Sequence, residues 1–205
     1  MDRTVRASSL LPFLTALLGM GIAGCGTSEP SRFYLLKASA WDTSQSVSAG
    51  KIRVGLHAFK LPPYLMRPNI VTVQEGNRIE IAEYDRWAES LEANLMRVLT
   101  INLTRLLPGA SVYRYPWRRV PGVAFEVEGE VLRFGLEDDG NVRMVVQWTL
   151  RNGGDAVGVD HRFVFARPPV GEGVPSIVGM MNQAVTALSQ EIAGEISRAD
   201  GVRTQ

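Results

Sequence analysis

The sequence AFEVEGEVLRF, residues 124–134, alternates apolar or small residues with glutamates over its first half. This alternation is typical of a β-strand with one buried and one solvated face. The turn sequence DDGN follows at 138–141 and leads into a second apolar stretch at 142–150. A second turn, NGGD at 152–155, leads into a third at 157–166. The spacing predicts three long antiparallel strands joined by tight turns.

Two helices flank this predicted meander. A helical apolar stripe runs from about residue 176 to 198, after a Pro- and Gly-rich loop. The earlier helix is expected to begin near Trp87, with Asp85 as its N-cap, and to end before Pro108. Its apolar residues also follow helical spacing.

Shorter stretches complete the expected sheet. Strands are predicted at 33–36, 51–59 and 112–115, and a hairpin joins 70–73 to 78–82. In the strand at 51–59, the side chains expected to face inward are Ile52, Val54, Leu56 and Ala58. The fold class is therefore α+β: one domain, a mixed or antiparallel sheet, and two long amphipathic helices packed on it.

The amino terminus carries the pattern of an export signal. Arg3 and Arg6 precede a short apolar run, and Cys25 follows Ile22-Ala23-Gly24. These four residues resemble the bacterial lipobox, in which the cysteine sulfur receives a diacylglyceryl group and the new amine is acylated. A buried, unreactive cysteine after an ordinary signal or a spanning helix is the alternative, but the run is short and broken by glycine.

This pattern gives the expected organisation of the chain. Residues 1–24 form the signal, 25–32 the lipidated terminus and tether, 33–199 the domain and 200–205 a tail. The covalent lipid on Cys25 anchors the protein to a membrane, and no other cofactor and no metal is expected. Because Cys25 is the only cysteine, the domain is expected to fold without disulfides or structural zinc.

Composition excludes some functions. Without residues 1–24, which hold Arg3, Arg6 and Asp2, the chain has 22 − 2 = 20 basic and 21 − 1 = 20 acidic residues. A nucleic-acid-binding protein would show a basic excess. The two histidines, His57 and His161, each lie on a predicted strand outside any recognised catalytic motif, so no enzyme activity is expected.

One segment mixes aromatic residues with arginines. Tyr115, Trp117, Arg118 and Arg119 lie together in YRYPWRR, residues 113–119. Tyr, Trp and Arg are favoured at protein interfaces, and arginine also suits lipid headgroups. A solvated loop beside an edge strand is the alternative interpretation.

Two further stretches carry a family resemblance. LPPYLMRPNIV at 61–71 and YDRWAESL at 84–91 resemble the ABC-type transport auxiliary lipoprotein family, of the PqiC and YmbA type. The resemblance implies a periplasm-facing lipoprotein that works with an MCE-domain protein and its transport complex in moving lipids between membranes. Gly26, after Cys25, resembles the residue of lipoproteins sorted to the outer membrane.

The resemblance leads to two hypotheses. The first is a non-enzymatic lipoprotein that docks the MCE assembly at the outer membrane, with Arg67 and Trp87 shaping a partner surface. A core role for Trp87 and a pairing role for Arg67 are the alternatives. The second is an independent lipid carrier with its own apolar cavity between sheet and helices. Homo-oligomerisation stays open.

Overall fold

A computed structural model describes residues 28–39, 52–116, 122–153, 155 and 157–203. The predicted signal and Cys25 lie outside these residues, as do Trp117, Arg118 and Arg119. Within the described part, residues 31–203 form one compact unit.

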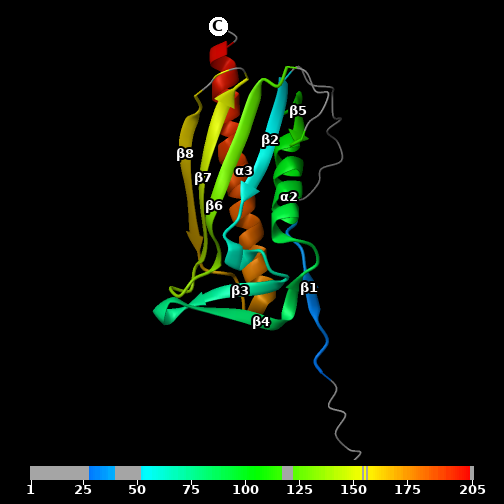
Figure 1. The fold of residues 1–205 in the computed structure, drawn as a ribbon, viewed down its shortest axis with the longest axis vertical. Coiled ribbons are helices and arrows are strands. Elements are labelled where there is room, and N and C mark those ends of the chain that lie inside the picture. Colours follow the sequence, from blue (N-terminus) through cyan, green and yellow to red (C-terminus); the bar gives the residue numbers. More distant parts are fainter. Residues whose placement is uncertain (1–27, 40–51, 117–121, 154, 156, 204–205) are drawn as a thin grey trace, which may run out of the picture. The chain divides into compact units, whose positions relative to one another are not determined.

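The larger sheet has five strands in the order β5-β2-β6-β7-β8 (Figure 1). Their bounds are β2 Ile52–Lys60, β5 Ala110–Arg114, β6 Phe125–Leu136, β7 Val142–Asn152 and β8 Val159–Arg167. The first three strands in this order are parallel to one another, and β6, β7 and β8 form the predicted antiparallel meander. The sheet is therefore mixed.

A smaller sheet lies at one end of the larger one (Figure 1). Its order is β1-β4-β3, with β1 Arg32–Tyr34, β3 Asn69–Gln74 and β4 Arg78–Trp87. Strands β3 and β4 form the predicted hairpin, and β1 pairs in parallel with the far end of β4. Short 3-10 turns at Pro63–Leu65 and Glu75–Asn77 precede β3 and β4.

Both helices cover one face of the five-stranded sheet (Figure 1). Helix α2 spans Leu91–Leu106, and α3 spans Gly173–Arg203. The predicted α3 stripe is buried, but the helix begins earlier and continues through residues expected to form a tail. The inner face of the sheet and the two helices share one apolar core, so the α+β prediction is confirmed.

Asp85 does not cap α2 as predicted. It lies within β4, which continues to Trp87, and Ser90 is the N-cap, its Oγ accepting from the Ala93 amide at 3.2 Å. The first strand is also shorter than expected and ends at Tyr34. Strand pairing with β1 and β3 overrides the local capping signal at Asp85.

A β-bulge changes which side chains of β2 point into the core. The register with β6 shifts between Leu56 and Phe59, so Ala58 is exposed rather than inward and Phe59 is completely buried. The Phe59 ring lies directly over Gly129 of β6. A glycine is required there because a Cβ atom would lie 2.5 Å from the ring.

We expect Gly129→Ala to lower the free energy of unfolding by about 1–3 kcal/mol, because the buried Phe59 ring must move. A Phe59→Leu background should remove part of that penalty. Gly179→Ala, on the exposed side of α3 with open space at its Cβ, is the matched control and should be neutral or stabilising. Urea unfolding would measure all three. Equal effects at the two glycines would contradict this account.

Candidate functional site

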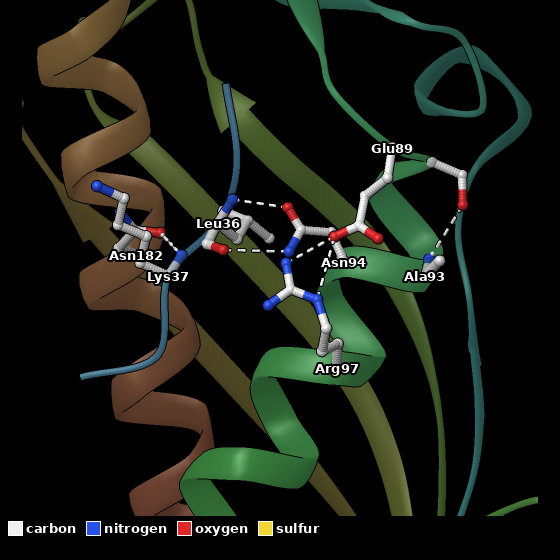
Figure 2. Close-up of polar contacts among 8 residues, drawn as sticks. Leu36, Lys37, Glu89, Ala93, Asn94, Arg97 and Asn182 are labelled. Atoms are coloured by element: carbon white, nitrogen blue, oxygen red, sulfur yellow. Dashed lines mark hydrogen bonds and ion pairs between the residues drawn. The ribbon is translucent and has the colours of Figure 1, made fainter. Parts of the chain in front are cut away.

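The segment Leu35–Ser39, here called the strap, follows β1 and lies between α2 and α3 (Figure 2). Leu36 is only 1% exposed and belongs to the core. The fully buried Asn94 of α2 accepts from the Leu36 amide at 2.6 Å and donates to the Leu36 carbonyl at 3.1 Å. One side-chain amide thus satisfies both backbone groups of Leu36.

Two more asparagines hold the strap. Asn182 of α3 accepts from the Lys37 amide at 2.9 Å (Figure 2). Asn102 of α2 accepts from the Ser39 amide at 3.3 Å and donates to Ser189 of α3 at 3.1 Å. The strap is therefore bound to both helices, which are themselves joined beneath it.

The first turn of α2 positions Asn94. Ser90 caps the helix, and Arg97 donates to Glu89 at 2.6 Å across the turn (Figure 2). The Ser90 contact satisfies one of the free amides at the helix start and defines where the helix begins. The orientation of Asn94 toward the strap follows from this start.

A charged cluster holds β1 just before the strap. Both Asp85 carboxylate oxygens accept from Arg32, at 2.7 and 3.0 Å, and Oδ1 also accepts from the Tyr34 hydroxyl at 2.8 Å. The bonds from Arg32 are the main reason that the pKa of Asp85 lies below its usual 3.8, and the Tyr34 bond adds to this effect. The pKa of Tyr34 is raised by burial and by its bond to Asp85.

The opposite, outer face of the five-stranded sheet carries a concavity of about 810 Å³. At one side His57 stacks on Tyr115, with ring centroids 5.2 Å apart, and its Nε2 lies 2.9 Å from Glu126. Tyr115 itself is 63% exposed. No described helix covers this face (Figure 1).

A row of four outward polar side chains crosses the concavity. Lys60 of β2 pairs in register with Glu130 of β6, Glu130 with Gln147 of β7, and Gln147 with Arg162 of β8. All four are exposed and line the concavity. Neighbouring residues instead bond to one another, as Thr149 does to Asp160 at 2.7 Å. The row thus offers both charges and an amide to a ligand.

The described residues contain no cluster of three or more His, Cys, Asp or Glu that could hold a metal ion. His161 stacks on Trp148 with centroids 4.2 Å apart, and its Nδ1 lies 3.9 Å from Glu195. The His161 ring therefore lies on the side of β8 that faces α3, and the residue also contributes to the lining of the concavity.

The three predicted contact residues that the structure describes, Arg67, Trp87 and Tyr115, do not form one surface. Trp87 is 6% exposed, so it anchors the core and its ring is not a contact surface. Arg67 is half-buried beside the small sheet, whereas Tyr115 lies on the outer face of the large one. The strap was not predicted from the sequence, although Asn94 and Asn102 are the two polar residues on the otherwise apolar buried face of α2.

The fold and site define a class: an α+β domain without a described catalytic or metal centre, whose amino-terminal segment is fixed between two helices. A family model described as ABC-type transport auxiliary lipoprotein component matches residues 34–193. This chain belongs to that family.

Known proteins extend this assignment. The intermembrane transport lipoprotein PqiC of Escherichia coli (strain K12) is 25% identical over 183 residues, covering 88% of this chain and 96% of the relative; PqiC of Shigella flexneri matches equally. A crystal structure of an uncharacterized protein has a TM-score of 0.70 and 23% identity, covering 82% of this chain and 99% of its own. A crystal structure of a protein from Xanthomonas campestris has a TM-score of 0.67 and 14% identity, covering 83% of this chain and 99% of its own. These two structures confirm the fold.

Membership identifies the chain as an auxiliary lipoprotein of a transport system rather than a member of a known enzyme class. Neither described helix is long and apolar enough to cross a membrane.

Asn94→Ala should lower the free energy of unfolding by about 2–4 kcal/mol, because both backbone groups of Leu36 lose their partner in a buried position. Asn182→Ala removes a single bond at an exposed position and should cost less than about 1 kcal/mol. Urea unfolding and hydrogen exchange at the Leu36 amide would test both. A wild-type exchange rate at the Leu36 amide in the Asn94 variant would refute the role of the Asn94–Leu36 contact.

Asp85→Asn should cost about 1–2 kcal/mol at neutral pH, since the bonds to Arg32 lose their charge and Arg32 is partly solvent-screened. The folded pKa of Asp85 is lowered, so its contribution is present above the usual 3.8 and disappears as the pH falls through the lowered value. The stability difference between wild type and variant should therefore shrink in acid. Asp138→Asn, in an exposed turn, controls for the loss of a carboxylate. A difference independent of pH would count against this linkage.

Proposed function

We propose that this chain is a non-enzymatic, periplasm-facing outer-membrane lipoprotein that docks an MCE-domain protein of an intermembrane lipid-transport complex. The observation that carries the proposal is the strap: the chain downstream of the lipobox is hydrogen-bonded to both helices of the family's domain. The name of the E. coli relative, an intermembrane transport lipoprotein, supports the transport role.

Acylation of Cys25 would set the distance between domain and membrane. Six residues lie between Cys25 and Arg32, and a fully extended chain spans at most about 25 Å over the seven steps from one to the other. From Arg32 onward the chain is bound to the domain by Asp85, Asn94 and Asn182. Such a short link suits a subunit that receives a partner close to the bilayer.

The outer face of the five-stranded sheet is the docking surface we favour. The row Lys60, Glu130, Gln147 and Arg162 is exposed, and within the described part of the chain these side chains form no hydrogen bond or ion pair. A protein partner with complementary charges would satisfy them. Tyr115 at the margin of the concavity adds an exposed aromatic side chain, a residue type enriched at interfaces.

The alternative, an independent lipid carrier with its own apolar cavity, lacks support from the described residues. The space between sheet and helices is filled by side chains such as Phe59, Leu99 and Ile192, all completely buried. A second described cavity of about 470 Å³ lies beside the strap and α3; most of the residues around it are polar, but the surface that they present to it is mainly apolar. Native mass spectrometry that detects bound lipid would revive the carrier hypothesis.

Crosslinking in intact cells, followed by purification and mass spectrometry, tests the docking role. The wild-type protein should capture an MCE-domain protein, and Cys25→Ala should capture less because it lacks the anchor. Lipid recovered without a protein partner would favour the carrier instead.

The docking surface is tested by reversing two charges, Lys60→Glu with Arg162→Glu. This variant should lose capture of the MCE protein at least about tenfold, since unfavourable charge pairs cost several kcal/mol at an interface. Arg198→Glu, an exposed cation on α3, is the matched control and should behave as wild type. Circular dichroism would verify folding of each. Undiminished capture by the double variant would exclude this face as the interface.

A further inference from the structure

The small sheet has a corner where exposed apolar and cationic residues lie beside the start of the anchored segment. Phe33 of β1 pairs in register with Arg86 of β4, and Arg86 pairs with Asn69 of β3. Met66 and Arg67 immediately precede Pro68 and Asn69. The Trp87 amide donates to the Pro68 carbonyl at 2.6 Å, which holds this loop against β4.

The apolar residues of this corner face solvent. Phe33 is 64% and Met66 65% exposed, and Leu35 is also exposed. Along β1 and the strap, Tyr34 and Leu36 turn inward, so Phe33 and Leu35 alternate outward. Isolated exposed hydrophobic residues are ordinary, but Phe33 and Leu35 follow Cys25 by only eight and ten positions in the chain, and their exposure is not explained by folding.

Two arginines in the same corner lack acceptors. The Nε atom of Arg67 is buried without a hydrogen-bond partner. Neither Arg67 nor Arg86 forms an ion pair with any residue that the structure describes, and the nearby Asp85 is already bonded to Arg32. Arg86 is exposed and Arg67 is half-buried, so the accessible parts of both guanidinium groups can donate charge-assisted hydrogen bonds to an anionic group.

We infer that this corner, formed by Phe33, Leu35, Met66, Arg67 and Arg86, rests on the phospholipid surface that holds the anchor. Phe33 and Met66 enter the boundary between headgroups and acyl chains, and the two guanidinium groups contact lipid phosphates. The inference rests on the proposed acylation of Cys25, because the short tether keeps the corner within reach of the bilayer. It adds a second, non-covalent membrane contact to the covalent anchor and thereby orients the domain.

A spin label measures this contact directly. Acylated Cys25 has no free thiol and is the only cysteine, so Met66→Cys can be labelled specifically with a nitroxide in the full-length protein. The protein is reconstituted into vesicles of phosphatidylethanolamine and phosphatidylglycerol. The ratio of accessibility to oxygen over a water-soluble nickel complex should be at least about threefold higher at position 66 than at Val164→Cys, because oxygen concentrates in the acyl region. Val164 is exposed on the outer face of β8 and is the matched control.

A second variant tests the arginines. Arg67→Gln with Arg86→Gln should lower the ratio at position 66 about twofold, since both phosphate contacts are removed. Arg162→Gln, outside the corner, should leave the ratio unchanged. An unchanged ratio in the first variant would overturn the role assigned to the arginines.

The outcomes separate this inference from the proposed function. Mass spectrometry of the Cys25 peptide shows whether the anchor is present, and the vesicles contain no protein partner, so a failure of MCE docking cannot affect the result. If Cys25 is acylated and position 66 is as accessible to nickel as position 164, the inference is wrong. Shielding of position 66 from both reagents would also overturn it, because another protein copy would then cover the corner.

Discussion

The arrangement of the amino-terminal segment depends on the hydrogen bonds between the side-chain amide of Asn94 and the backbone of Leu36. A segment that passes between two helices has no backbone partners there, because helical amides and carbonyls are already bonded within each helix. The strap must therefore be satisfied by side chains. Asn94 substitutes for a neighbouring strand by offering one donor and one acceptor to Leu36, and Asn182 and Asn102 continue this pattern.

The elements that could be predicted from the sequence are those whose pattern of residues lies within a short stretch of the chain. Alternation in β6 and the turn before β7 identify the meander, because side-chain period and turn chemistry are both contained within a few residues. The α3 stripe is equally local, and its side chains are buried as expected. The two helices and the sheet then share one core, since no other arrangement buries both apolar stripes.

The errors arise where distant contacts outweigh local preference. Asp85 has the chemistry of an N-cap, but its partner Arg32 lies 53 residues away and pairing holds it in β4. Ala58 follows the alternation of β2, yet the bulge brings the larger Phe59 inward over Gly129. The Asn94–Leu36 contact spans 58 residues. A polar residue on an apolar helix face is visible in the sequence, but its partner is not.

The strap also connects the corner of the small sheet to the elements that support the outer face of the five-stranded sheet. Because it bonds to both α2 and α3, its release would break contacts with each helix and expose Leu36 to water. The helices in turn pack on the inner face of the sheet whose outer face carries the row from Lys60 to Arg162. In the proposed arrangement, a membrane contact at the β1 corner and a partner on the outer face would thus be joined by packed elements. On this proposal, the packing from the strap through the helices to the sheet would fix most of the distance between the bilayer and the docking surface.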